Sequence, residues 1–121
     1  MAKKLDILFV NPLVQEQVYQ DLGKHLTAIE PPTWCRLLAS YMDIKGASVD
    51  ILDAETKSYD VESGIQKATD ADPKLVVVVA HGQQPSASTQ LMPAVTYFCR
   101  RFKAERENIP ILVVGGHPAA L

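Results

Sequence analysis

Four short apolar runs recur along the chain, and a polar or glycine-containing segment follows each of them. They span residues 5–10, 48–52, 75–79 and 111–114 and read LDILFV, SVDIL, LVVVV and ILVV. Runs this rich in apolar and β-branched residues are typical of strands buried on both faces, as in a parallel sheet covered by helices. The pattern therefore predicts four parallel strands.

Two segments with helical spacing lie between the first three runs. The first covers 32–45, between a proline pair that suits a helix start and Gly46 where helices stop. The apolar residues that we expect on its inward face are Trp34, Leu37, Leu38, Tyr41 and Met42. A weaker pattern over about 60–71 predicts a second helix, whose inward residues are Val61, Ile65 and Ala68.

A third helix is expected over about 88–107, so that Pro93 must lie near its first turn. Its inward stripe consists of Leu91, Val95, Phe98 and Phe102. The resulting β-α-β-α-β-α-β order implies right-handed crossovers and a Rossmann-like, doubly wound α/β domain over residues 1–121. The first connection, which includes 13–29, is long for a βα loop. The chain stops soon after the fourth run, so we expect a final helix and strand to be missing.

Composition narrows the range of partners. A net charge of −2 with 47% hydrophobic residues favours neither nucleic acid nor an anionic membrane surface. No stretch approaches the ~20 apolar residues of a membrane span, and no signal peptide precedes the first run, so we expect a cytoplasmic protein with reduced thiols. The basic residues Arg100, Arg101, Lys103 and Arg106 are interpreted as the C-terminal end of a helix rather than a binding patch.

Ligands of open parallel sheets bind beyond the carboxyl ends of the strands, where the strand order changes direction. Segment 80–89 is the most informative, because a histidine, two amides and three hydroxyls lead into a helix N-terminus. Such an array can hydrogen-bond a large polar ligand. The strand-end positions are Asn11, Pro12, Asp53, His81, Gly82, Gln83, Ser86, Ser88, Thr89, Gly115, Gly116 and His117.

Several familiar sites are excluded by missing motifs. The first strand is not followed by the glycine fingerprint of dinucleotide folds, and no P-loop occurs. Ser86, His81 and Asp53 could form a hydrolase triad, but no Gly-x-Ser-x-Gly motif holds the serine. His81 and His117 lack a third metal ligand nearby. Cys35 is interpreted as a packing residue.

Separated motifs, in the same order along the chain, carry a resemblance to a known family. They read LFVNP at 8–12, EPP at 30–32, LDAE at 52–55, HGQQPSASTQ at 81–90 and VGGHP at 114–118. Over nearly its whole length the chain resembles the N-terminal cobalamin (B12)-binding domain of B12-dependent radical SAM enzymes. The resemblance implies a flavodoxin-like, B12-binding version of the Rossmann-like fold.

The resemblance also implies roles for the strand-end residues. The corrin ring would lie across the strand ends, and its nucleotide tail would run beside the sheet. Ser86, Ser88 and Thr89 would contact the tail, while Gly115 and Gly116 would let it pass close to the backbone. The residues expected around the corrin are Asn11, Pro12, Glu30, His81, Gly82 and Gln83, with Asp53 and His117 at neighbouring strand ends.

Two departures from B12 and radical SAM motifs limit this interpretation. The Asp-x-His-x-x-Gly loop that gives a histidine to cobalt is absent, so cobalamin would bind without a histidine from the loop after the first strand. The Cys-x-x-x-Cys-x-x-Cys motif is absent too, so the iron–sulfur cluster and S-adenosylmethionine would belong to a catalytic domain, in cis or in trans. The alternative is a flavodoxin- or receiver-like module without catalysis, although Ala80 stands where a receiver has an aspartate.

Overall fold

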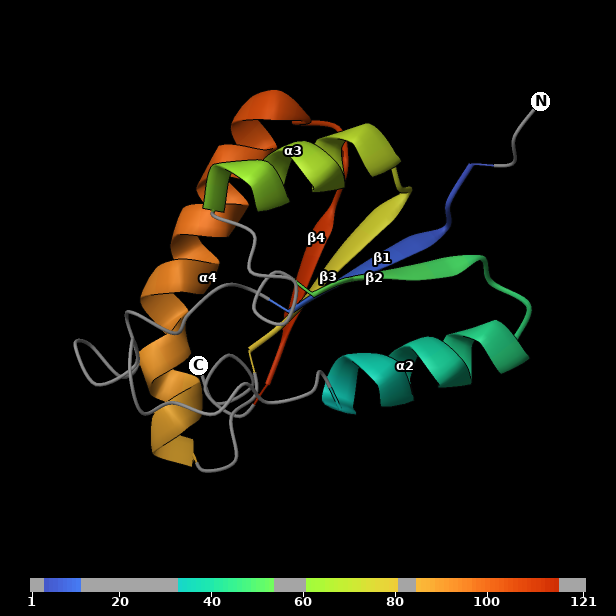
Figure 1. Ribbon diagram of the computed structural model, residues 1–121, viewed down its shortest axis with the longest axis horizontal. Coiled ribbons are helices and arrows are strands. Elements are labelled where there is room, and N and C mark those ends of the chain that lie inside the picture. The colour runs from blue at the N-terminus through green and yellow to red at the C-terminus, as the bar shows by residue number, and fades with distance from the viewer. Residues whose placement is uncertain (1–3, 12–32, 54–60, 81–84, 116–121) are drawn as a thin grey trace.

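The computed structural model is a parallel sheet with helices on both faces (Figure 1). It describes residues 4–11, 33–53, 61–80 and 85–115. The elements are β1 (Ile7–Asn11), α2 (Thr33–Ile44), β2 (Val49–Asp53), α3 (Val61–Ala71), β3 (Leu75–Val79), α4 (Pro85–Glu105) and β4 (Ile111–Val114). The four strands are all parallel, in the order β2-β1-β3-β4, which confirms the predicted α/β class.

Alternate residues of the central strands enter two separate cores. Leu8 and Val10 of β1 belong to the core beneath α3 and α4, whereas Ile7 and Phe9 belong to the core beneath α2. Successive side chains of a strand point to opposite faces, so a strand apolar throughout must be covered on both sides. Figure 1 shows this division, with α3 and α4 on one face of the sheet and α2 on the other.

Helix α4 contains a proline in its interior. The helix begins at Pro85, three residues before the predicted start, so the expectation that Pro93 lies near the first turn was wrong. Proline at the first helical position is well tolerated, whereas Pro93 lacks the N–H that would donate to the carbonyl of Thr89. Pro93 is exposed, and the helix continues beyond it because Val95 and Phe102 are buried against the sheet.

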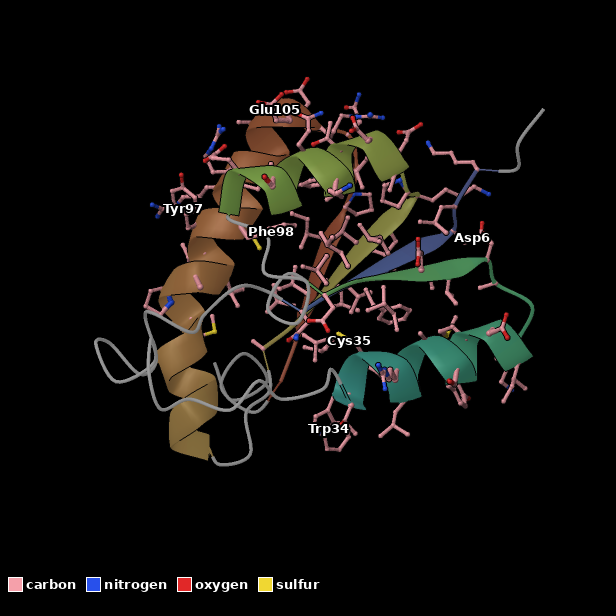
Figure 2. All side chains as sticks on the ribbon, in the orientation of Figure 1. Asp6, Trp34, Cys35, Tyr97, Phe98 and Glu105 are labelled. Carbon is pink, nitrogen blue, oxygen red and sulfur yellow. The ribbon has the colours of Figure 1, made fainter. Side chains whose placement is uncertain are left out.

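The prediction of the inward face of α2 is confirmed at Leu38 and Met42 and wrong at the other three residues. Cys35 and Ala39 are buried, with Leu38 and Met42 packed partly against the same core. The side chains that remain exposed are Trp34 (49%), Leu37 (56%), Tyr41 (59%) and Ile44 (82%). We call these four the outer stripe of α2; Figure 2 shows Trp34 directed away from the sheet. The small residues on the inner face let α2 approach the sheet closely, which the apolar periodicity did not reveal.

The basic end of α4 serves the fold, as the sequence indicated. Lys103 Nζ donates to the carbonyl oxygens of Glu107 and Ile109, at 3.2 and 2.7 Å, where the chain leaves the helix. Arg101 pairs with Glu62 of α3 at 2.8 Å, and Arg106 pairs with Asp72. None of the helices in the described ranges is long and apolar enough to cross a membrane.

Asp6 joins three strands at the amino edge of the sheet. Its carboxylate accepts the backbone N–H of Ser48 at 2.9 Å, and its own N–H donates to the Ser48 hydroxyl at 2.9 Å. Lys74 lies 3.1 Å from the same carboxyl group. The hydrogen bond from Ser48, together with Lys74, lowers the pKa of Asp6 below its ordinary value.

Truncation of a buried apolar side chain of α4 should lower the free energy of unfolding more than truncation of an exposed one on the outer stripe of α2. Phe102→Ala removes a fully buried ring and should lower the free energy of unfolding by about 3–5 kcal/mol. Leu37→Ala on the outer stripe should lower it by less than about 1 kcal/mol. Urea denaturation at neutral pH measures both values. A loss at Leu37 as large as that at Phe102 would mean that the outer stripe is buried in solution.

The lowered pKa of Asp6 predicts a pH-dependent contribution to stability. Because the folded-state value lies below 3.8, the ionised carboxylate stabilises the fold above that pH, and the contribution disappears as the pH falls through the folded pKa. Asp6→Asn should therefore lower the urea midpoint at pH 7, and its difference from the wild type should narrow below pH 3.8. The exposed Asp50→Asn is the control. A difference that stays constant with pH would contradict the assignment.

Candidate functional site

The carboxyl edge of the sheet brings four chain segments together. Asn11 and Asp53 are the last residues of β1 and β2, and their Cα positions are partners in the register. Ala80 follows β3, and Gly115 follows β4. The chain leaves β1 toward β2 on one side, while β3 lies on its other side. This is the switch point beside which open α/β sheets bind their ligands.

Asn11 and Asp53 form a polar pair at this edge. Asn11 Nδ2 donates to Asp53 Oδ1 at 2.9 Å. Both residues continue the alternation that directs Phe9 and Ile51 toward α2. Asp53 is only 8% exposed. Among the residues that the structure describes, it is the charged residue whose side chain is buried. The sequence placed each residue at the site, but it gave no indication of the hydrogen bond between them.

Cys35, in the first turn of α2, is buried close enough to Asp53 for the charge of Asp53 to act on its thiol. Burial, and secondly the charge of Asp53, raises the pKa of the Cys35 thiol to about 12. The thiol therefore stays protonated at physiological pH and is a poor nucleophile. Its side chain is 1% exposed and packs in the core beneath α2, which confirms the predicted packing role.

Gly115 is required by the backbone of the neighbouring strand. Its φ is +148°, and a Cβ at this position would overlap the carbonyl oxygen of Ala80 and lie 2.7 Å from the carbonyl carbon. The N–H of Ala80 donates to the carbonyl of Val114 at 2.7 Å, which holds the two strand ends together. Sequence reasoning identified Gly115 but not Ala80; the alanine directly after an all-valine strand end was the available signal.

The start of α4 lies at the same edge, because the helix returns antiparallel to the strands. Ser86, Ser88 and Thr89 belong to its first turns, so Ser86 is helical rather than part of a loop. Unpaired backbone N–H groups and the positive end of the dipole occur at such a helix start. The side chains of these three residues lie outside the described part. So do the predicted site residues Pro12, Glu30, His81, Gly82, Gln83, Gly116 and His117.

The described carboxyl edge offers hydrogen-bonding side chains, those of Asn11 and Asp53. Within the described ranges no group of three histidine, cysteine or acidic side chains could hold a metal ion. A hollow of about 600 Å³ lies at the opposite, amino edge, lined by Lys4, Lys74, Arg106 and their neighbours. Those cations already pair with Asp6 and Asp72. The candidate site therefore remains at the carboxyl edge.

Comparison with known protein families gives a match over most of the chain. Residues 19–121 match the family model of the B12 binding domain. No curated protein and no solved structure matches the chain. The match includes β2, β3, β4 and all three described helices, and the parallel Rossmann-like sheet agrees with the family's fold. Since the match covers well over half of the sequence, the chain belongs to the B12-binding domain family, whose cofactor is of the cobalamin type.

Proposed function

We propose that this chain is the cobalamin-binding module of a B12-dependent radical SAM enzyme. It would hold the corrinoid at the carboxyl edge of the sheet, without a histidine ligand from the loop after β1. The observation that supports this most strongly is the β2-β1-β3-β4 order in a member of the B12-binding family. That order opens the carboxyl edge between β1 and β3, next to the polar pair of Asn11 and Asp53.

The described residues fit a corrinoid. A corrinoid would bring its own nitrogen ligands for cobalt, so the protein would mainly provide shape and hydrogen bonds. Asn11 and Asp53 provide polar groups beside β1. Ala80 and Gly115, directly after β3 and β4, lie in close backbone contact, so no side chain projects from Gly115 at this half of the edge. The N-terminus of α4 is suited to the tail's phosphate.

The assignment to radical SAM enzymes rests on the sequence motifs. The segments LFVNP, LDAE, HGQQPSASTQ and VGGHP resemble the strand ends of that group's cobalamin domain. The side chains of the two cysteines pack within the domain, one of them buried and the other half-buried. The cysteine ligands of an iron–sulfur cluster would therefore belong to a partner catalytic domain, in cis or in trans. Bound cobalamin supplies a cobalt centre that serves methyl transfer or ring formation. The chain's own residues would bind and orient the corrinoid.

The proposal predicts direct binding of cobalamin by the purified chain. Titration with hydroxocobalamin should give a saturable change in the visible spectrum at a stoichiometry of one per chain, because one carboxyl edge is available. Equilibrium dialysis gives the affinity independently. A folded protein with neither a spectral change nor retained cobalamin would contradict the proposal.

Binding of the nucleotide tail at the start of α4 predicts that two matched threonine variants of this helix differ in their affinity for cobalamin. Thr89→Leu places a bulky apolar group where the tail is proposed to bind, and it should weaken cobalamin binding by about tenfold, the size of one lost polar contact. Thr96→Leu changes an exposed residue two turns later on the same helix and should leave the affinity unchanged. Gly115 is unsuitable as a probe, because any side chain there would overlap Ala80. Equal affinities of the two threonine variants would place the tail elsewhere.

A further inference from the structure

The hydrogen bond between Asn11 and Asp53 fixes the orientation of the Asn11 carboxamide. An ionised carboxylate can only accept hydrogen bonds, so the group that faces it must be the NH₂ of the asparagine. Asn11 Nδ2 indeed lies 2.9 Å from Asp53 Oδ1. Asp53 is 8% exposed and sits at the end of a sheet strand, so the pair is built on a rigid element.

The fixed orientation leaves two polar groups of Asn11 for a ligand. They are its Oδ1, which accepts, and the second N–H of Nδ2, which donates. Among the residues that the structure describes, neither group makes another hydrogen bond. An acceptor and a donor on one planar group match the donor and acceptor of a primary carboxamide. A carboxylate offers two acceptors and no donor, so it would leave Asn11 Oδ1 without a hydrogen bond.

Corrinoids carry primary carboxamides around the rim of the ring. We propose that Asp53 is a positioning residue that holds Asn11 ready to pair with one of these carboxamides. The pair thereby selects corrinoids that carry a carboxamide at that position over corrinoids that carry a carboxylate. This inference rests on the proposed function, since it takes the corrin to lie at the carboxyl edge within reach of Asn11 at the end of β1. The charge of Asp53, which also acts on the Cys35 thiol, adds to the discrimination against a second carboxylate.

The probes are cyanocobalamin and its three monocarboxylic acids, in which the b-, d- or e-propionamide is hydrolysed to a carboxylate. The wild-type chain should bind at least one acid about tenfold or more weakly than cyanocobalamin, as expected when a buried polar group loses its partner. In Asp53→Asn the new amide can donate as well as accept, so the carboxamide of Asn11 can flip and exchange the places of its oxygen and nitrogen. The preference for cyanocobalamin over that acid should then fall to about threefold or less.

A matched control is available on the same strand. Asp50→Asn makes the same change of charge on β2, but Asp50 is exposed and its carboxylate accepts the N–H of Ile51, at 2.8 Å. This variant should keep the wild-type ratio. Urea midpoints establish that each variant is folded. If Asp53→Asn does not fold, Asn11→Ala replaces it: the loss of the carboxamide should also bring the ratio toward one.

The outcomes separate this inference from the proposed function. Binding of cyanocobalamin without discrimination against any of the three acids would overturn the role of the pair and leave the proposed function standing. A wild-type ratio that persists in folded Asp53→Asn would also overturn it. Failure to bind any of the four corrinoids would overturn both proposals. Discrimination that is lost in Asp53→Asn and kept in Asp50→Asn supports the assignment.

Discussion

Burial of β1 and β3 on both faces is the constraint from which the rest of the structure follows. Each strand places alternate side chains in two cores: Val10 and Val78 in one core are at most 1% exposed, and Phe9 and Val77 in the other are at most 5% exposed. A strand with two apolar faces needs helices above and below it, and parallel neighbours then require crossover connections. The crossovers place α2 on one face and α3 and α4 on the other, and all four strands end at one edge.

At that edge the side chains change character because the strands leave the apolar layers. β1 and β2 end in Asn11 and Asp53, which satisfy each other by a hydrogen bond where isolated polar groups would be costly to bury. β3 and β4 end in Ala80 and Gly115, whose backbones touch so closely that no side chain fits at Gly115. One half of the edge is thus a polar pair, and in the other half two backbone segments are in close contact.

Helix α2 combines two apolar surfaces of different kinds. Its inner face buries the small residues Cys35 and Ala39, with Leu38 and Met42 partly packed beside them, while the outer stripe is exposed. The thiol on the inner face is inert because burial and Asp53 keep it protonated. The size of the apolar groups therefore does not decide which face of this helix is buried, since Trp34, Leu37 and Tyr41 are exposed.

The sequence by itself determined the strands, the fold class and the strand-end residues Asn11, Asp53 and Gly115. Apolar alternation and turn residues are local signals, so the strand bounds agree to within two residues. The tertiary structure decided the hydrogen bond between Asn11 and Asp53 and the contact of Gly115 with Ala80, because both depend on strand register. It also decided the buried face of α2 and the position of Pro93 within α4, because packing against the sheet outweighs local propensity there. Glu30, His81 and His117 stay predictions of the sequence.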